Sequence, residues 1–506
     1  MGIKTPEQFI ESLRDGRTVY LNGEKVKDVT THPMLKTCVA TAAMDYRMAE
    51  MPEYHDLCVV EDKKLKEPIS RYFHWPKNGD DLLKKHEMML QACRLNSAVT
   101  PFAREMIDAF NAVLITANTM GKKEYIERAE AYHTYLKKND LAICGAITDV
   151  KGDRSLRPSD PKQQHKDYYL RVVDKGKDGI VVRGSKAHIT ASPYVNEMIV
   201  LPCRNMTEAD ADYAVTFALP VNAKGVTHIA HPFRSAESTA DFPVPITIPA
   251  HTDCMIVFDD VFVPWERVFM CGEWQYAQTV VYNFAYLHRH TATTYHIPMV
   301  EIMVGLAATI ADYHGIEKSA LIREKITDLI IYLNTMKSLA RASCIDYVMH
   351  GGMAIPNPVN SNLAKYYYAN EYHNASKIME DLAGGLLTTA PSYRDWNNPE
   401  TRRFMEKYLG GRSGVSSEDR LRILQLMRVY PYLGLESDIL NIHAEGSLMA
   451  ERLTIYAESR KEIEEYKKTA KYVAGVGKPT WEDYKKQCDA LCKLGTNVEE
   501  GLMPLF

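Results

Sequence analysis

The chain has 506 residues, of which 46% are hydrophobic and 25% are charged, and its formal net charge is −4. That length exceeds one ordinary hydrophobic core and predicts two to four packing units. The mixed charges exclude the basic stripe that binding to a phosphate backbone requires, so nucleic acid is not an expected partner. No apolar secretory signal begins the chain, and ten dispersed cysteines predict free thiols in a reducing cytoplasm.

Residues 1–140 have the pattern of helices. Thr5 is placed to cap a first helix that has Glu7 and Gln8 in its first turn. Apolar residues at helical spacing predict further helices over residues 81–93, 108–115 and 122–136.

Residues 141 to about 270 have the pattern of strands. Segments 168–173 and 180–183 flank a glycine-containing turn and predict a hairpin. Further strands are expected at residues 197–201, 213–219, 254–258 and 258–264.

From about residue 275 the helical pattern returns in longer segments. The apolar run 297–311 contains Glu301 and is too short to cross a bilayer, so it predicts a buried core helix and no membrane span. Helices with a broad apolar face, which suits a bundle, are expected over residues 319–349, 364–382 and 417–427. The helix–sheet–helix order predicts an α+β fold, with the crevice between layers as the default ligand site.

The common nucleotide-binding and hydrolase motifs are absent from the sequence. No GxGxxG follows a strand, and GxxxxGK[ST], GxSxG and HExxH do not occur. A flavin would therefore be held by another fold. Cys488 and Cys492 stand one helical turn apart, but a metal site needs about four ligands and no second pair accompanies them. We therefore expect no metal.

Two segments concentrate polar side chains. Residues 145–158 contain seven of them, which suits a loop around a pyrophosphate or the polar edge of a flavin. Composition alone favours the alternative, a solvated loop with Asp–Arg pairs. Residues 183–192 place Lys186, His188 and Thr190 alternately, so on a strand they would share one face. Polar groups that alternate on a buried face need partners.

A series of distinct motifs occurs in order along the chain. The longest are TDVKGDRSLRP (148–158), DGIVVRGSKAHITAS (178–192) and FDDVFVPWERVF (258–269), and the shorter ones are PEQFIESL (6–13), DAFNA (108–112), FAYLHRH (284–290), DLAGGLL (381–387) and HAEGS (443–447). Together they closely resemble the 4-hydroxybutyryl-CoA dehydratase family. That family is a branch of the group that also contains the 4-hydroxyphenylacetate 3-hydroxylase oxygenases, and the likeness covers nearly the whole chain.

The resemblance implies a fold, a cofactor and an assembly. The fold is that of acyl-CoA dehydrogenases, with an N-terminal helical domain (1–140), a middle β domain (141–272) and a C-terminal four-helix bundle with a tail (273–506). FAD is the implied cofactor, and a cytoplasmic homotetramer is the implied assembly. The residues expected to line the flavin are Thr148, Lys151, Asp153, Arg154, His188 and Thr190. Gly446 and Ser447 are expected to approach it from another helix or subunit.

The chain differs from this family at the positions of the metal ligands. The dehydratases hold a [4Fe–4S] cluster with three cysteines and one histidine, and two of those cysteines stand just before DAFNA. Here that stretch reads AVTPFAR (98–104), without a thiol, and Tyr295 stands at the third cysteine. His288 keeps the place of the ligand histidine. Because such clusters require thiolates, we expect none in this protein.

The resemblance also suggests catalytic residues. His288 is the expected general base, and a hydrogen-bonded structural histidine is the equal alternative. Without iron, expulsion of a poor leaving group needs another acid, for which His290, His296 and Tyr295 are candidates. Asp253 falls where the dehydratases carry an active-site glutamate, so it is either a partner carboxylate or a turn residue.

Three functions stay open. The first is a flavoenzyme that acts at C–H bonds of an activated acid such as an acyl-CoA, by elimination, isomerisation or dehydrogenation. The second is a two-component FAD monooxygenase that hydroxylates an aromatic acid or phenol with reduced flavin from a partner reductase. The residues that hold the phenol in that branch are replaced here by Glu105, Ala109 and either Cys144 or Gly145. The third is a flavin-binding or assembly subunit without activity.

Overall fold

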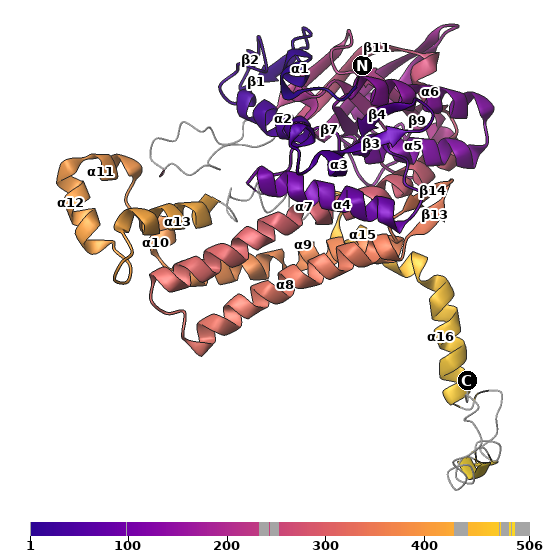
Figure 1. Cartoon of the computed structure of the whole chain (residues 1–506). Helices are drawn as coiled ribbons and strands as arrows, with labels where there is room; N and C mark the ends of the chain where they lie inside the picture. The colour runs from indigo at the N-terminus through magenta and orange to yellow at the C-terminus, as the bar shows by residue number, and fades with distance from the viewer. Residues whose placement is uncertain are drawn as a thin grey trace. The chain divides into compact units, whose positions relative to one another are not determined.

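The computed structural model of the chain describes residues 2–97, 99–231, 242, 252–429, 444–474, 476, 485, 486 and 488–490. The chain divides into two compact units, Met1–Glu451 and Arg452–Phe506, and each is described by itself. Helices and strands are both abundant (Figure 1). Their order along the first unit is mainly helical, then mainly strands, then helical again, as the sequence predicts.

The N-terminal part is largely helical. Its helices are α1 (Pro6–Glu11), α2 (Leu35–Glu50), α3 (His55–Cys58), α4 (Gly79–Leu95), α5 (Ile107–Met120) and α6 (Lys123–Asn139). Thr5 caps α1 as predicted, because its hydroxyl accepts a hydrogen bond from the backbone N–H of Gln8 while the Gln8 side chain accepts one from the N–H of Thr5. A two-stranded sheet of β3 (Val59–Asp62) and β4 (Glu67–Ser70) was not predicted.

Two larger sheets follow. Their strands are β1 (Val19–Leu21), β2 (Glu24–Lys25), β5 (Ile143–Ala146), β6 (Arg171–Lys175), β7 (Gly179–Thr190), β8 (Glu197–Val200), β9 (Val215–Pro220), β10 (Val226–Ala230), β11 (Asp253–Pro264) and β12 (Val268–Cys271). The six-stranded sheet has the order β2-β1-β10-β11-β7-β6, and the four-stranded sheet has the order β12-β9-β8-β5. The predicted β6–β7 hairpin is confirmed. Strand β1 pairs parallel with β10, so the N-terminal segment also contributes to the larger sheet.

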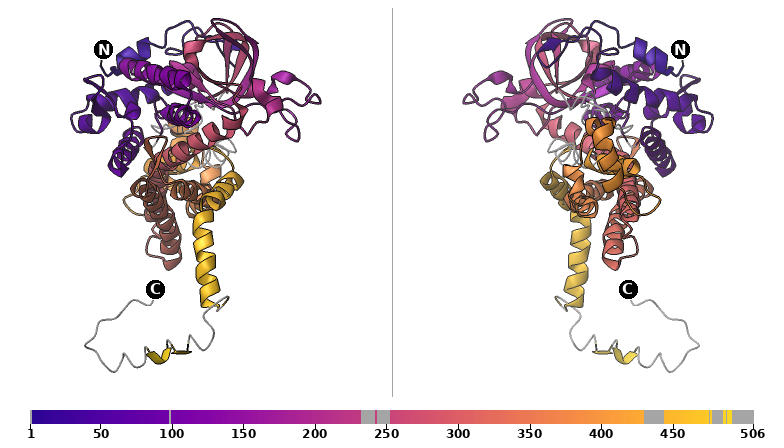
Figure 2. Two further views of the ribbon diagram at one scale, coloured as in Figure 1. Left: turned by 90° about the vertical axis from the view of Figure 1, so that its right-hand side faces the viewer. Right: turned by 90° about the vertical axis from the view of Figure 1, so that its left-hand side faces the viewer.

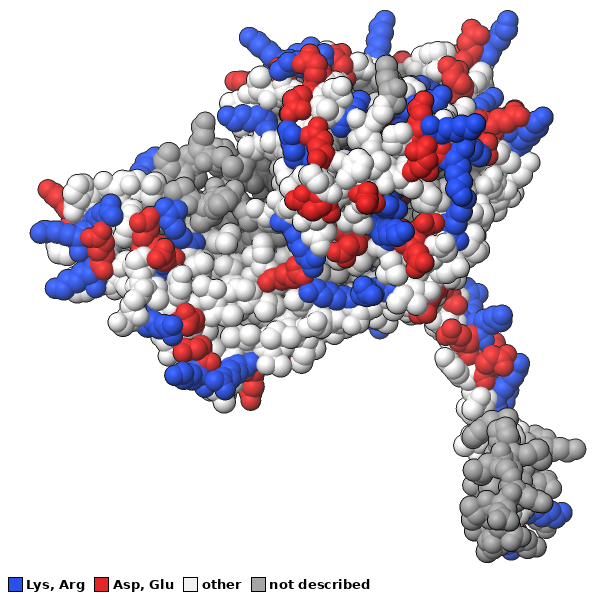
Figure 3. Space-filling view, in the orientation of Figure 1, with Lys and Arg blue, Asp and Glu red and all other residues white. Residues whose placement is uncertain are grey.

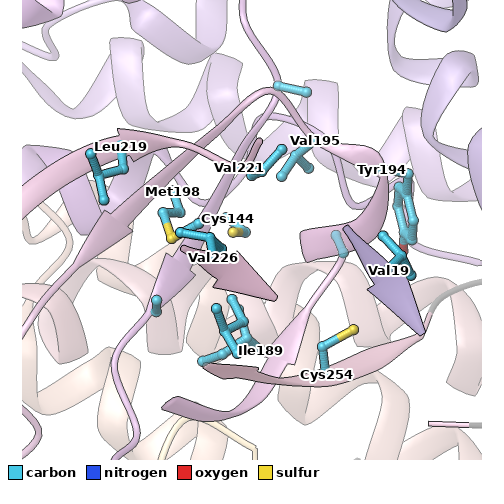
Figure 4. Close-up of a cluster of buried hydrophobic side chains, with 14 of the residues drawn as sticks. Val19, Cys144, Ile189, Tyr194, Val195, Met198, Leu219, Val221, Val226 and Cys254 are labelled. Atoms are coloured by element: carbon cyan, nitrogen blue, oxygen red, sulfur yellow. The ribbon is translucent and has the colours of Figure 1, made fainter. Parts of the chain in front are cut away.

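The strands of the two sheets lie close together (Figure 2), and the sheets share one apolar core (Figure 4). In Figure 4, Met198 and Leu219 of the four-stranded sheet lie toward Ile189, Val226 and Cys254 of the six-stranded sheet. All five side chains are buried. Strands β7, β10 and β11 largely alternate buried and less buried residues, as expected for strands with one face on such a core. Strands β5, β8 and β9 are instead buried along almost their whole length.

The expected alternation of Lys186, His188 and Thr190 on one face of β7 is wrong. Lys186 is buried, His188 is exposed and Thr190 is half-buried. The register of β7 on β11 shifts between the pairs Cys254–Ile189 and Ile256–Lys186, and His188 adopts a left-handed backbone with φ of +59°. The extra residue in this β-bulge interrupts the alternation of side chains between the two faces of the strand.

Long helices form the rest of the first unit. They are α7 (Ala277–Tyr313), α8 (Ala320–Ile345), α9 (Pro358–Ala383) and α13 (Ser417–Val429), with the shorter α10 (Leu386–Thr389), α11 (Tyr393–Asn397) and α12 (Pro399–Tyr408). A hairpin of β13 (Val348–His350) and β14 (Met353–Ile355) joins α8 to α9. Helices α7, α8 and α9 pack on one another around a shared apolar core (Figure 1). Helix α15 (Leu448–Glu458) crosses the boundary between the units, and α16 (Arg460–Val473) belongs to the second.

Helix α7 with its preceding turn is long and apolar enough to cross a membrane by length and composition. However, 61% of its apolar window is buried inside the protein. Its residues Ile297, Val300 and Met303 belong to the core of the helical bundle. This agrees with the prediction of a core helix. On the face drawn in Figure 3, acidic and basic side chains are interspersed among the described residues, as the sequence composition predicts.

Candidate functional site

The polar loop that follows β5 is fastened to strand β7 by a buried ion pair. The ammonium of Lys186 lies 2.9 Å from a carboxylate oxygen of Asp149, and both side chains are 2% exposed. The same ammonium donates hydrogen bonds to the carbonyl oxygens of Ile147 at 2.9 Å and Leu201 at 2.8 Å. Because both charges are partnered, the pair can remain buried and fix the start of the loop.

The six residues predicted to line a flavin lie on this loop and on the adjoining end of β7. The half-buried ones are Thr148, Lys151 and Thr190, and the exposed ones are Asp153, Arg154 and His188. The carbonyl oxygen of Thr148 accepts a hydrogen bond from the backbone N–H of Ala187 at 2.8 Å, so loop and strand end run side by side. The structure therefore gathers these residues at one edge of the sheet.

Two carboxylates at this edge accept hydrogen bonds from nearby residues. Asp153 accepts hydrogen bonds from the backbone N–H of Ser155 at 2.9 Å and from its hydroxyl at 2.7 Å, and these lower the pKa of Asp153. Asp253, the first residue of β11, accepts a hydrogen bond from the Thr190 hydroxyl at 2.5 Å. Asp253 therefore belongs with the loop residues, and no hydrogen bond or ion pair joins it to His288 within the part of the chain that the structure describes.

A second group of polar residues is buried where α4, α5 and α7 meet. Asp108 on α5 is 1% exposed and lies 2.6 Å from the ammonium of Lys85 on α4. Its other oxygen accepts a hydrogen bond from the Thr291 hydroxyl at 2.6 Å and lies 3.4 Å from Nδ1 of His288. Burial acts to raise the pKa of Asp108, but Lys85 and His288 hold it well below its usual range.

Glu445 approaches the opposite side of His288. Its Oε1 atom lies 4.0 Å from Nε2 of His288 and accepts a hydrogen bond from the hydroxyl of Tyr295. Its Oε2 atom lies 3.4 Å from the ammonium of Lys365, which is fully buried on α9. Burial acts to raise the pKa of Glu445, but the charges around it, first that of Lys365, hold it below its usual value. Glu445 is therefore a buried carboxylate.

The turn that carries Glu445 has an unusual backbone. Glu445 has a φ of +62° and Gly446 a φ of +113°. A Cβ atom on Gly446 would lie 2.8 Å from a guanidinium nitrogen of Arg289, so the turn packs tightly on α7. Arg289 in turn donates a hydrogen bond to the Glu445 carbonyl at 3.2 Å. A non-glycine residue in the left-handed region costs energy and persists only when its surroundings enforce it.

A second carboxyl group, Glu451, is buried in the same region. It is fully buried, and neither of its side-chain oxygens has a hydrogen-bond partner among the described residues. Burial raises its pKa to about 7, against the opposing charges of Lys365 and Arg289. A buried acid of this kind holds its proton near neutral pH.

The other histidines of α7 make different contacts. His290 contacts the hydroxyl of Ser343 at 2.9 Å, and burial lowers its pKa to about 4. His296 contacts the carbonyl oxygen of Ala292 at 2.8 Å and stacks on the ring of Tyr368 with a centroid distance of 4.3 Å. His296 therefore resembles a packed structural histidine.

The region where the dehydratases carry cysteines is aromatic here. Phe102 and Tyr295 pack edge to face with ring centroids 5.8 Å apart, and Cys93 lies in the same apolar cluster. Burial raises the pKa of the Cys93 thiol above its usual value, which disfavours a thiolate. Across the described residues, which leave out Ala98, no group of three or more His, Cys, Asp or Glu side chains is arranged to hold a metal ion.

The structure thus assembles the predicted residues other than His290 and His296 into two groups. The loop group contains the six predicted flavin-lining residues and Asp253, and the helix group contains His288, Tyr295 and the turn of Gly446 and Ser447. The sequence analysis did not identify four charged residues of the helix group, namely Lys85, Asp108, Lys365 and Glu451. It included Glu445 within the HAEGS motif but gave it no role. Asp108 lies in DAFNA and Glu445 in HAEGS, whose His443 is outside the described residues, so a motif signal existed for both. The two lysines have no such signal.

Comparison with known proteins gives consistent matches over almost the entire chain. Residues 5–270 match the family model described as 4-hydroxyphenylacetate 3-hydroxylase N terminal, and residues 277–475 match the C-terminal model. A 4-hydroxybutyryl-CoA dehydratase/vinylacetyl-CoA-Δ-isomerase from Clostridium aminobutyricum is 33% identical over 94% of this chain and 100% of its own.

Solved structures agree with these matches. An oxygen-tolerant archaeal 4-hydroxybutyryl-CoA dehydratase from N. maritimus superposes with a TM-score of 0.87, at 30% identity, over 94% of this chain and 96% of its own. The oxygenase component of 4-hydroxyphenylacetate 3-monooxygenase, complexed with FAD and 4-hydroxyphenylacetate, has a TM-score of 0.79 at 24% identity and covers 98% of this chain and 100% of its own. The second likeness concerns the fold. On the family models and the dehydratase identity, this chain belongs to the 4-hydroxyphenylacetate 3-hydroxylase family, which includes the 4-hydroxybutyryl-CoA dehydratases.

Proposed function

We propose that this protein is an FAD-dependent enzyme that acts at C–H bonds of an activated acid of the acyl-CoA kind, by elimination, isomerisation or dehydrogenation. The observation that carries the proposal is the convergence of His288 and Glu445, with Nε2 and Oε1 4.0 Å apart in a buried setting. The 33% identity to a dehydratase/isomerase named for acyl-CoA substrates supports the substrate class.

The residues of the loop group fit a flavin. They offer hydroxyl, imidazole, ammonium and guanidinium groups that are exposed or half-buried along one edge, at Thr148, Lys151, Arg154, His188 and Thr190. These are the donors that the polar edge of an isoalloxazine and a pyrophosphate require. When bound, FAD supplies an acceptor for electrons from the substrate. Asp153, which is used within its own turn, would shape the loop and contact the cofactor only at its edge.

His288 and Glu445 would supply proton transfer. Two atoms 4.0 Å apart are too distant to hydrogen bond to each other, yet a third atom can lie about 3 Å from both. His288 would take the proton from carbon at such a position. Glu445, held by Tyr295 and Lys365, would hold or return a proton at Oε1.

The residues present do not fit an iron–sulfur cluster. The stretch 98–104 contains no cysteine, and Tyr295 stands at the position of the third cysteine, so none of these positions offers a thiolate. The thiol of Cys93 is packed in an apolar cluster with Tyr295. We therefore propose chemistry that does not use a cluster, with Tyr295 and His296 as secondary candidates for proton donors and Asp253 as a residue of the cofactor edge.

The monooxygenase alternative is favoured by the names of the family models. The monooxygenase alternative is disfavoured by the residues at the phenol-holding positions. Glu105, Ala109 and Cys144 replace the residues that hold the phenol in that branch, and all three are buried. Burial raises the pKa of Glu105 to about 8. Under either function we also propose a cytoplasmic homotetramer. We propose that each chain is divided into three domains, residues 1–140, 141–272 and 273–506. The monooxygenase would in addition need a partner flavin reductase.

The test is turnover by purified protein loaded with FAD. Vinylacetyl-CoA, 4-hydroxybutyryl-CoA and saturated short acyl-CoAs are offered, and products are identified by mass spectrometry. We expect product from at least one of them, and we expect His288→Gln and Glu445→Gln each to lower kcat by about 100-fold or more while FAD remains bound. The exposed His373 on α9 provides the control His373→Gln.

The opposite result is equally clear. Hydroxylation of 4-hydroxyphenylacetate that requires added reductase, NADH and oxygen, with no change in any acyl-CoA, would establish the monooxygenase. Full activity in both variants would remove His288 and Glu445 from the chemistry.

A further inference from the structure

We propose that Asp108, held in place by Lys85, is a positioning residue that keeps the proton of His288 on Nδ1 and leaves Nε2 free toward Glu445. This inference rests on the proposed function, in which His288 is the base. Neither Asp108 nor Lys85 is assigned a role by the motifs of the sequence. Both act through the imidazole and would not touch the substrate.

Asp108 is placed to act only as an acceptor. One oxygen lies 2.6 Å from the ammonium of Lys85, and the other accepts from Thr291 at 2.6 Å and faces Nδ1 of His288 at 3.4 Å. An ionised carboxylate has lone pairs and no proton, so a nitrogen within hydrogen-bond distance of it must carry one; Nδ1 lies within that distance of Asp108, whereas Nε2 is 4.0 Å from Glu445. A neutral imidazole has a single N–H, which this arrangement assigns to Nδ1.

The consequence appears on the other side of the ring. With Nδ1 protonated, Nε2 presents a lone pair toward Oε1 of Glu445, 4.0 Å away. The ring is held in this orientation by stacking on Phe284, with a centroid distance of 4.9 Å and an angle of 19°. A base nitrogen fixed in tautomer and direction needs no rearrangement before it accepts a proton, which is the logic of a nucleophile or base oriented by a third group.

Lys85 is the part of the arrangement that keeps Asp108 charged. Asp108 is 1% exposed, and a carboxylate buried to that degree without a cation favours its protonated form. A protonated Asp108 could donate a hydrogen bond to Nδ1 and would move the imidazole proton to Nε2. Removal of Lys85 should therefore have the same effect on His288 as replacement of Asp108 by a group that can donate.

A purely structural role makes a different prediction. The ion pair also links α4 to α5, and the Thr291 hydroxyl links α5 to α7, so every change here lowers stability. If that were its only purpose, the tautomer of His288 would not follow the identity of residue 108. Stability alone therefore cannot decide, and the position of the proton can.

The experiment reads the proton directly. Full-length protein with 15N-labelled histidine is studied by solid-state NMR at mildly alkaline pH, and His288→Gln identifies the His288 signals. We expect an Nδ1–H tautomer in the wild type, and a shift to Nε2–H in Asp108→Asn and in Lys85→Met. Lys84→Met, at the exposed neighbouring position of α4, and Thr291→Val should both leave the Nδ1–H tautomer unchanged.

Three outcomes would overturn the inference: a wild-type His288 with its proton on Nε2, a wild-type imidazolium, or the wild-type tautomer retained in both Asp108→Asn and Lys85→Met. If Asp108→Asn does not fold, Lys85→Met decides alone. Activity provides the second readout, since Asp108→Asn should lower kcat by about 100-fold to 10,000-fold with little change in KM. Full turnover by His288→Gln would contradict the proposed base, whereas loss of turnover there with the tautomer unchanged in both Asp108→Asn and Lys85→Met contradicts this inference alone.

Discussion

Lys186 and Asp149 form an ion pair in which both side chains are 2% exposed, and this pair joins the polar loop to the core of the larger sheet. The two residues also face each other as an isolated β-bridge, so backbone and side chains make the same connection. The exposed loop residues beyond Asp149 therefore start from a fixed point. This relationship links the stability of the sheet to the geometry of the proposed flavin edge.

The first prediction concerns this pair. Lys186→Met leaves the Asp149 carboxylate buried without its cation, and the loss of one partner of a buried pair costs about 3–5 kcal/mol. We expect a lower midpoint in urea unfolding and weaker retention of FAD during gel filtration. Arg183→Met on the same strand is the control, because its ion pair with Asp260 is exposed and such pairs contribute about 1 kcal/mol or less. Equal loss of FAD in both variants would contradict the role of Lys186.

Much of the fold could be predicted from the sequence because the local signals agree with the final packing. The hairpin around residue 177 and the cap at Thr5 depend on neighbours within a few residues, and both are confirmed. The β-bulge at His188 could not be predicted. Its cause is the register of β7 on β11, whose paired residues are about 65 positions apart in sequence.

The site could be predicted only in part, because it too depends on contacts between residues far apart in the sequence. His288 was identified through its motif, and Asp108 and Glu445 lie within quoted motifs, yet their meeting depends on the packing of three segments from distant parts of the chain. Lys85 and Lys365 each stand on an ordinary helix, where a lysine normally faces solvent. Only the tertiary structure buries Lys365 or brings Lys85 to Asp108.

The second prediction concerns the turn at Gly446. Gly446→Ala places a Cβ atom 2.8 Å from the Arg289 guanidinium and strains a backbone with φ of +113°. We expect the free energy of unfolding to fall by about 1–3 kcal/mol and turnover to fall as Glu445 is displaced. Gly384→Ala is the matched control, since its φ is +69° but its Cβ would meet open space. Equal turnover in the two variants would show that the Arg289 contact is not needed.

The third prediction concerns pH and Glu451. Its pKa rises from an ordinary 4.5 to about 7 in the folded protein, so the native state keeps a proton that the unfolded state releases in this window. The contribution of Glu451 to stability is therefore fully present below about pH 4.5 and is lost as the pH rises to about 7, by at most about 3 kcal/mol. Glu451→Gln has no proton to release, so its stability relative to the wild type should increase across that window.

Unfolding midpoints measured at about pH 5 and about pH 8 test this prediction. The exposed Glu380 on α9 provides the control Glu380→Gln, which should follow the wild type at both pH values. A constant difference between Glu451→Gln and the wild type would mean that Glu451 is ionised throughout.

The fourth prediction separates two roles for Tyr295. Its hydroxyl donates to Glu445, so Tyr295→Phe removes one hydrogen bond from a buried carboxylate. The pKa of Glu445 should then rise, and because less of the carboxylate is ionised at low pH, the acidic limb of the kcat profile should move to higher pH. We expect activity to survive at alkaline pH, and stability to fall by about 1–2 kcal/mol. Tyr332→Phe, which removes a buried hydroxyl that donates to the Tyr368 carbonyl, should cost similar stability without moving the profile. Loss of turnover at every pH in Tyr295→Phe would instead make Tyr295 the proton donor itself.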